Sequence, residues 1–243
     1  MRVVTWNLQC NRGACVLPWL QSRLDADILF LQESNSPNCK GSVYWNGIPS
    51  VGWGSAVVVA TGSLREIPIA GYDGWVIGGE LLDSGLADRE HGLYAFSVHS
   101  PTGTSASPRR SYVEESLEIV KLIKQQVPSD AELVIGGDFN FLSLGHRQPG
   151  EVVQTSTAEK TALQQFVKFG LASCWAASHA EQPLPQTLRW SRDTAPGKTT
   201  PFHCDGILVP MTWSDRVFCE VLTSDAFKLS DHNPVAAWIS REG

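Results

Sequence analysis

Short apolar runs recur along the whole chain, separated by polar, glycine-containing or proline-containing stretches. Compact apolar runs of this length are typical of buried β-strands. They occupy Val3–Trp6, Ile28–Leu31, Ser55–Ala60, Gly74–Leu82, Leu93–Val98, Leu133–Ile135, Gly206–Val209, Phe218–Leu222 and Pro234–Ile239. Many short strands beside few long helices predict an α/β fold in which sheets pack face to face, with helices outside them.

Three segments carry helix signals. The first, residues 16–24, lies between the first two predicted strands. The other two begin with a capping box, Ser111 with Glu114 and Ser156 with Glu159, in which a hydroxyl and a carboxylate satisfy free N–H groups at a helix start. Apolar residues at helical spacing follow both boxes, so we expect two amphipathic helices there.

The composition is that of one soluble globular unit. The chain has 243 residues, of which 42% are hydrophobic, and this length suits a single domain spanning residues 1–243. No apolar stretch approaches the ~20 residues of a membrane span. The segment Met1–Asn7 leads directly into a strand instead of an export signal, so we expect a cytoplasmic monomer whose six cysteines are reduced.

The formal net charge of −6 argues against a broad surface for duplex DNA. Proteins that hold long duplexes mainly through phosphate contacts are usually basic. A nuclease remains possible, because bound metal ions can neutralise a local acidic pocket.

Polar residues that could act in catalysis or metal binding stand at the ends of many predicted strands. One Asp, Asn or His in such a place is usually a turn, cap or hydrogen-bonding residue, but a whole set in one chain is hard to explain as turns alone. The set comprises Asn7, Glu33, His99, Asp138, Asn140, Asp205, Asp231 and His232.

Four members of this set are carboxylates, Glu33, Asp138, Asp205 and Asp231. If they converge, their mutual repulsion raises their pKa values unless a cation is present. Hard oxygen ligands without a thiolate favour Mg²⁺ or Mn²⁺ over zinc. Such a metal suits a phosphate substrate, because it polarises a phosphoryl oxygen and steadies a leaving oxyanion.

Four ordered motifs resemble those of the endonuclease/exonuclease/phosphatase superfamily. They are Thr5-Trp6-Asn7, Leu31-Gln32-Glu33, Gly137-Asp138-Phe139-Asn140 and Ser230-Asp231-His232-Asn233-Pro234, and together they span most of the chain. The resemblance implies a four-layered α/β sandwich with two central mixed β-sheets flanked by helices. It also implies a metal-dependent phosphodiesterase or phosphatase with one cleft at the strand ends.

The same resemblance implies the metal-binding and water-handling residues. Glu33 matches the principal ligand of a Mg²⁺ or Mn²⁺ ion, with Asn7 beside it and Asp231 as a second acidic residue near the metal. Asp138 and Asn140 match the pair that handles the attacking water and the scissile phosphate.

Histidines are implied as the remaining catalytic groups. His232 matches the catalytic histidine and Asp205 the carboxylate that orients it, while His99 resembles the second histidine of the deoxyribonuclease branch. Arg147, in the loop after the Asp138 motif, is a candidate phosphate contact.

Three positions depart from the abasic-site repair branch. Asn35 stands where those enzymes have a lysine, His203 where they have an arginine, and Gly206 where an aromatic residue is usual. These departures weaken a DNA-repair function and leave the metal chemistry intact.

The sequence supports other functions less well than it supports this one. Ser230, Asp231 and His232 cannot form a serine-hydrolase relay, because neighbours on an extended chain point in different directions. A nuclease acting on DNA or RNA is the leading hypothesis. The alternatives are a phosphatase or phosphodiesterase for a small-molecule or lipid phosphoester, and a non-catalytic binding module on the same fold. Trp45, Trp53 and Trp190, which lie nearer to predicted loops, could stack on a base or another ring.

Overall fold

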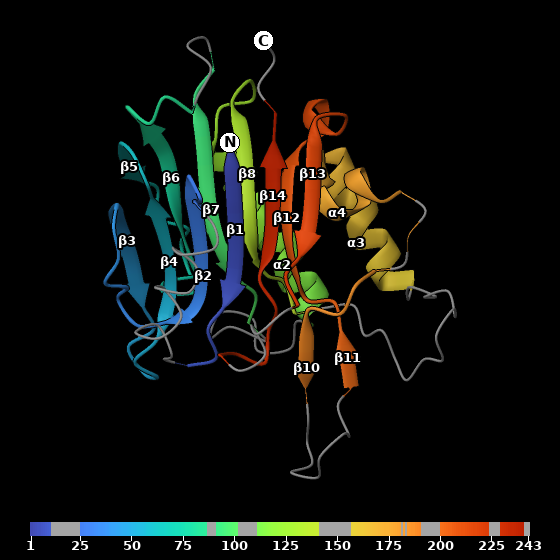
Figure 1. Cartoon of the computed structure of the whole chain (residues 1–243), viewed down its shortest axis with the longest axis horizontal. Coiled ribbons are helices and arrows are strands. Elements are labelled where there is room, and N and C mark those ends of the chain that lie inside the picture. Colours follow the sequence, from blue (N-terminus) through green and yellow to red (C-terminus); the bar gives the residue numbers. More distant parts are fainter. Residues whose placement is uncertain are drawn as a thin grey trace.

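A computed structural model gives the architecture of the chain (Figure 1). The structure describes residues 1–10, 25–86, 91–101, 111–140, 157–180, 182, 184–190, 200–223 and 229–240. The predicted helix over residues 16–24, the capping serine at 156 and the candidate phosphate contact Arg147 lie outside these ranges.

The first of two six-stranded sheets has the order β13-β14-β1-β2-β4-β3. The pair β1–β2 is parallel, and the other described pairs of this sheet are antiparallel. Its strands are β1 (Arg2–Asn7), β2 (Ile28–Ser34), β3 (Ser42–Gly47), β4 (Gly54–Val59), β13 (Val217–Val221) and β14 (Val235–Ile239).

The second sheet has the order β5-β6-β7-β8-β12-β9 and is also mixed, with a parallel β7–β8 pair. Its strands are β5 (Ser63–Glu66), β6 (Val76–Leu82), β7 (Leu93–His99), β8 (Glu132–Asp138), β9 (Leu171–Ser173) and β12 (Asp205–Pro210). A separate antiparallel pair, β10 (Leu188–Trp190) and β11 (Thr200–Phe202), projects beyond the lower end of the sandwich in Figure 1.

The described helices are α2 (Tyr112–Gln126), α3 (Thr157–Lys168) and α4 (Cys174–Ser178), followed later by a 3₁₀ turn at Met211–Trp213. The capping box predicted at Ser111 and Glu114 is confirmed, with both of its hydrogen bonds present. After α3, Gly170 adopts φ +76°, a left-handed conformation that ends helices and favours glycine. No helix in the described residues is long and apolar enough to cross a membrane.

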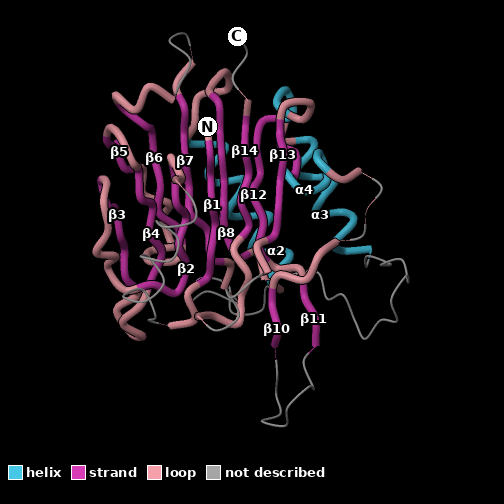
Figure 2. The backbone as a smooth tube through the Cα atoms, viewed as in Figure 1, coloured by secondary structure: helices cyan, strands magenta, loops and turns pink. Residues whose placement is uncertain are grey.

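The main hydrophobic core lies between the two sheets. Phe30 and Val57 of the first sheet are fully buried in one cluster with Ala95 and Val134 of the second. A second core lies on the other face of the second sheet, where helix residues such as Ile119 pack with strand residues. Figure 2 shows the helices gathered on that side. The predicted α/β sandwich with two central mixed sheets is therefore confirmed, and every strand predicted from the apolar runs is present.

Gly136 and Gly137 allow close packing around β8. A Cβ at Gly136 would lie 2.2 Å from the ring of Phe30 in the opposite sheet, and one at Gly137 would lie 2.0 Å from the Val98 carbonyl oxygen. Neither glycine has a positive φ angle. Two glycines directly before Asp138 suggest a backbone that needs unusual freedom, but this interpretation is wrong. Glycine is required there because neighbouring atoms occupy the space that a side chain would fill.

A buried network of hydrogen bonds joins the two sheets near the ends of β2 and β7. The amide nitrogen of Gln32 donates to the hydroxyls of Ser97, at 3.0 Å, and Thr5, at 3.2 Å. The Ser97 hydroxyl donates in turn to the Leu31 carbonyl, at 3.1 Å. Because buried polar groups must be paired, this network fixes β2 relative to β7 one residue from Glu33.

Candidate active site

The strand register brings the polar strand ends together at one end of the sandwich. Asp138, the last residue of β8, lies opposite His99 of β7 and opposite Asp205 of β12. Asn7 ends β1, and His232 lies in the turn just before β14. Residues far apart in the sequence thus surround Asp138.

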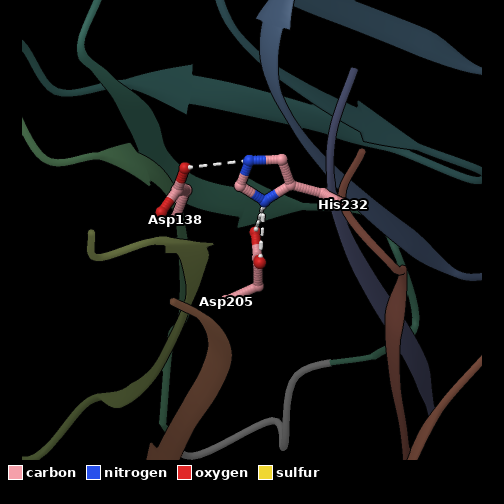
Figure 3. A group of neighbouring side chains, drawn as sticks. All are labelled: Asp138, Asp205 and His232. Atoms are coloured by element: carbon pink, nitrogen blue, oxygen red, sulfur yellow. Dashed lines mark hydrogen bonds and ion pairs between the residues drawn. The ribbon is translucent and has the colours of Figure 1, made fainter. Parts of the chain in front are cut away.

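His232 and Asp205 form a buried hydrogen-bonded pair (Figure 3). Nδ1 of His232 lies 2.9 Å and 3.1 Å from the two carboxylate oxygens of Asp205. Burial alone lowers the pKa of His232, but the carboxylates of Asp205, Asp138 and Asp231 outweigh it and raise that pKa to about 10. Burial raises the pKa of Asp205, and the neighbouring imidazole opposes this rise. The arrangement fixes the Nδ1–H tautomer and leaves Nε2 facing the other carboxylates.

Asp138 lies between the two histidines. Its Oδ2 is 3.8 Å from Nε2 of His232 and 3.9 Å from Nε2 of His99. Oδ2 also accepts a hydrogen bond from the Asn7 amide at 2.8 Å, and Oδ1 accepts one from the backbone N–H of Asn140 at 2.9 Å. The carboxylate is 1% exposed, so these contacts hold it in one orientation.

Glu33 reaches the same site from an irregular position in β2. The register between β2 and β4 shifts between Leu31 and Ser34, and Glu33 has φ +47°, which is uncommon for a non-glycine residue. Its Oε1 accepts a hydrogen bond from Asn7 at 3.1 Å and lies 3.8 Å from Nε2 of His99. The bulge turns the carboxylate toward the site, and such irregularities often re-aim a functional side chain.

Asp231 supplies the outermost carboxylate. Its Oδ2 accepts a hydrogen bond from the Gln9 side chain at 3.0 Å, and its Oδ1 lies 3.9 Å from Nε2 of His232. That Oδ1 is buried without a hydrogen-bond partner in the described residues. Burial raises the pKa of Asp231, and the negative charge of Glu33 adds to this rise.

These donors fit a hard cation. The ligand atoms are carboxylate and amide oxygens, and the unpaired, buried Oδ1 of Asp231 lacks the partner that such an atom needs. Ligating atoms of Asp138, Asp205 and His232 also lie within 4.8 Å of one another. We interpret those three residues as a hydrogen-bonded array, because Nδ1 of His232 is held by Asp205.

His99 is the second histidine of the site. It is 6% exposed, and burial lowers its pKa, although the carboxylates of Asp138 and Glu33 oppose the shift. Its ring contacts two indoles, those of Trp53 and Trp75. Asn140 has φ +54° and donates from its side-chain amide to the Ser100 carbonyl at 3.0 Å. One N–H of that amide group remains for another acceptor.

Sequence patterns alone did not point to several supporting residues. Gln9 and Cys10 contact Asp231 and Glu33, the latter contact being 2.7 Å from Sγ to Oε2. Cys10 is exposed, and its pKa is raised to about 12 by partial burial and by Glu33. Both residues follow Asn7 with positive φ angles, which pattern matching does not reveal.

The segment Gln186–Arg189 contacts two parts of the site. In the structure, the Thr187 hydroxyl accepts from the backbone N–H of Asp205 at 3.1 Å. Arg189 donates to the side-chain oxygen of Asn233 at 2.5 Å and to the Ser230 carbonyl at 3.1 Å. The segment therefore supports both the residue that orients His232 and the turn that carries His232.

The sequence profile of the Endonuclease/Exonuclease/phosphatase family matches residues 4–232. The chain belongs to this family. The matched region contains the first three motifs, ends at His232 within the fourth, and includes every residue of the site described above. A search of curated proteins found no match.

Solved structures share the fold over almost the entire chain. An AP endonuclease from Archaeoglobus fulgidus has a TM-score of 0.70 at 16% identity, covering 99% of this chain and 100% of that one. The 3′ phosphatase NExo from Neisseria, bound to a product DNA hairpin, has a TM-score of 0.71 at 18% identity, with 99% and 100% covered. The catalytic domain of Xenopus laevis APE2 has a TM-score of 0.70 at 18% identity, with 98% and 91% covered.

Proposed function

We propose that this family member is a Mg²⁺- or Mn²⁺-dependent phosphoester hydrolase, a nuclease that cleaves phosphodiester bonds of DNA or RNA. The observation that carries the proposal is the position of Asp138. It is flanked by two histidine Nε2 atoms within 3.9 Å, and one of these rings is held by Asp205. A buried carboxylate between two such groups suits a reaction in which a proton is taken from water and charge develops on a phosphate.

Glu33, Asn7 and Asp231 would hold the metal ion in this proposal. When bound, the metal would polarise the phosphoryl oxygen and neutralise charge on the leaving group. Asn7 links the metal-binding group to the rest of the site, because its amide hydrogen-bonds to both Glu33 and Asp138.

Asp138 would orient the attacking water and accept its proton. Asp205 accepts from Nδ1–H of His232 and holds the ring in place, and the raised pKa favours the charged ring, which would present its second N–H, at Nε2, to a phosphate oxygen. His99 and Asn140 would contact the remaining phosphate oxygens. Arg147 remains our sequence-based proposal for a further phosphate contact.

The experiment is a substrate panel on metal-stripped protein, with Mg²⁺ or Mn²⁺ added back. It compares plasmid, single-stranded DNA, RNA, an abasic-site duplex, bis-p-nitrophenyl phosphate and inositol phosphates. We expect hydrolysis that excess EDTA abolishes and Mg²⁺ or Mn²⁺ restores. Full activity in excess chelator, or no hydrolysis of any substrate, would contradict the proposal.

A matched pair of variants separates the site from general damage. Asp138→Asn removes the carboxylate between the histidines, whereas Asp130→Asn makes the same change in an exposed turn before the opposite end of β8. We expect loss of activity for the first and wild-type activity for the second. Equal activities in the two variants would show that the Asp138 carboxylate is not needed for the reaction.

The second candidate is a phosphatase or phosphodiesterase for a small phosphoester. The acidic net charge of −6 favours it, because a small substrate needs no extended basic surface. It predicts higher kcat/KM on the small esters of the panel than on any polymer. Asn35 and His203 lead us to expect no preference for the abasic-site duplex. A non-catalytic binding module would bind a panel member without hydrolysing it.

A further inference from the structure

Two tryptophans form an aromatic wall beside the site. The ring centroid of Trp53 lies 5.4 Å from that of His99 and 5.5 Å from that of Trp75, and Trp75 lies 5.1 Å from His99. His99 in turn lies within 3.9 Å of Asp138 and Glu33. The indoles are therefore one side chain away from the carboxylates of the proposed reaction.

Hydrogen bonds of the backbone position the two tryptophans of this wall. Trp53 ends a tight turn in which its carbonyl accepts from the Ile48 N–H at 2.8 Å. The Trp75 carbonyl accepts from the backbone N–H of His99 at 2.8 Å and from the Ser55 hydroxyl at 3.0 Å. The Trp75 carbonyl thus joins Ser55 of the first sheet to His99 of the second. Both indoles contact His99 at the end of the sheets that carries the site.

The exposure of the three rings differs. His99 is almost fully buried, whereas Trp53 and Trp75 are only half-buried. Large aromatic rings contribute most of their stabilisation when they are buried, so partly exposed indole surface beside a polar site is available for a ligand. Nucleobases stack on such rings whatever their sequence, because every base has a π-face.

We infer that Trp53 is a stacking surface for an unpaired nucleobase attached to the scissile phosphate. This inference rests on the proposed function and narrows its substrate to single-stranded nucleic acid, strand ends or free nucleotides. A base inside a duplex is already stacked and would have to be flipped out to reach the wall. The net charge of −6 agrees, since a single nucleotide requires little of the basic surface that a long duplex requires.

The competing role for Trp53 is purely structural. The indole would cover His99 and hold its ring, with no contact to substrate. Removing it would then lower kcat for every substrate alike, because the histidine would be misplaced in each case. Stacking instead raises KM only for substrates that carry a base, so the two roles differ in the parameter and the substrate they affect.

The test compares two p-nitrophenyl esters that differ only in the base. One is thymidine 5′-(p-nitrophenyl phosphate), and the other is its base-free deoxyribose counterpart. For Trp53→Leu we expect KM for the thymidine ester to rise about tenfold with kcat nearly unchanged, and the base-free ester to be unaffected. Trp53→Phe should keep most of the wild-type KM, because a ring remains.

The control is Trp238→Phe. Trp238 lies in β14 opposite Arg2, at the end of β1 farthest from Asn7. This variant should leave kcat and KM unchanged for both esters. Equal losses on the two esters for Trp53→Leu would overturn the inference and assign Trp53 to the support of His99.

Binding measurements keep the inference separate from the proposed activity. Calorimetry should show that wild-type protein binds thymidine 5′-monophosphate more tightly than deoxyribose 5-phosphate, and that Trp53→Leu loses this difference. Equal affinities for the two in the wild type would overturn the stacking role, whether or not the protein hydrolyses any ester. If the affinities differ but no ester is cleaved, the proposed hydrolysis fails while the stacking site stands. In polymer assays, single-stranded oligonucleotides should be preferred to the same sequence as a duplex.

Discussion

Thr187 and Asp205 are joined through one buried hydroxyl. Oγ1 of Thr187 accepts the backbone N–H of Asp205 at 3.1 Å and that of Cys204 at 2.8 Å. The same hydroxyl hydrogen-bonds to the Asp205 carboxyl and lowers its pKa, which opposes the effect of burial. Thr187 is fully buried, so the start of β12 and the carboxylate that holds His232 share one support.

Thr187→Val tests this support, because valine has nearly the shape of threonine without the hydroxyl. Two backbone N–H groups would lose their acceptor, and an unsatisfied buried group costs about 1–3 kcal/mol. For the two groups together we expect the free energy of unfolding to fall by about 2–6 kcal/mol, and kcat to fall more than KM rises. Denaturant unfolding and steady-state kinetics measure both, and Thr187→Ser, which keeps the hydroxyl, is the control. Wild-type stability and kcat in the valine variant would show that Thr187 is not a support.

Arg189 should position the turn that carries His232. Its two donors reach the Asn233 side chain and the Ser230 carbonyl, on either side of His232, and a lysine cannot make both contacts in the same geometry. Because a small displacement of a catalytic group is costly, we expect Arg189→Met to lower kcat by roughly ten- to a hundredfold with KM little changed.

The readout that separates positioning from mere folding is the proton on Nδ1 of His232. Nuclear magnetic resonance should show this hydrogen-bonded proton at low field in the wild type and shifted or broadened in Arg189→Met. Arg65→Met is the matched control, because Arg65 is an exposed arginine paired with Glu80 far along the chain from His232. An unchanged signal with lowered kcat would mean that Arg189 acts in another way.

His203 should make the fold sensitive to mild acid. The ring is 8% exposed, its Nδ1 lies 2.8 Å from the Pro185 carbonyl, and burial lowers its pKa from 6.5 to about 4. Above pH 6.5 the ring is neutral in both states. Between pH 6.5 and about pH 4, His203 is protonated in the unfolded chain but stays neutral in the folded one. The free energy of unfolding therefore decreases as the pH falls through this range.

One pKa unit corresponds to about 1.4 kcal/mol, so this loss amounts to about 3 kcal/mol at most. Denaturant unfolding at several pH values measures this loss of stability. The difference between wild type and His203→Gln isolates the contribution of His203 from that of Asp205. The raised pKa of Asp205 has the opposite effect, because it makes the folded state more stable as the pH falls. Parallel stability curves for the two proteins between pH 7 and 4 would rule out the protonation of His203.

The sequence predicted the strands well because each is a compact apolar run, and the sandwich follows from burying both faces. The sequence also predicted the site residues at the strand ends, because polar and charged side chains are unusual next to buried apolar strands unless they have a function. It missed β3 and β5, whose exposed or half-buried residues give no continuous apolar run. Trp45 was misplaced for the same reason.

The supporting residues of the site could not be predicted. Thr187 and Arg189 act through contacts with residues 18 and 44 positions away, and no local pattern encodes such a pairing. The bulge at Glu33 is equally invisible, because its positive φ angle depends on how β2 meets β4. The family resemblance named the residues that would react, and the structure adds what holds them in place.

Glu33→Gln should separate metal binding from folding. The substitution keeps the side-chain shape but removes one negative charge from a group of close carboxylates, where like charges repel. We expect the melting temperature without metal to stay the same or rise, and the increase on adding Mn²⁺ to be lost, since a ligand stabilises only the state that binds it. Differential scanning calorimetry with and without Mn²⁺ measures this. A large fall in the metal-free melting temperature would make the role of Glu33 structural.

His232 and Asp205 should act as one unit. His232→Ala removes charge stabilisation made mainly in the transition state, so we expect kcat to fall by roughly a hundredfold or more. Asp205→Asn keeps the shape of the side chain but presents an amide that can donate to Nδ1, which favours the wrong tautomer, so the loss should be smaller yet still large. Because the 2.9 Å contact makes Asp205 act only through the ring, the double variant should be little worse than His232→Ala alone. Steady-state kinetics of the wild type, the two single variants and the double variant complete this double-mutant cycle. Asp215→Asn, outside the site, controls for the loss of one negative charge. If the two losses multiply in the double variant, Asp205 acts independently of His232, and the histidine needs another partner.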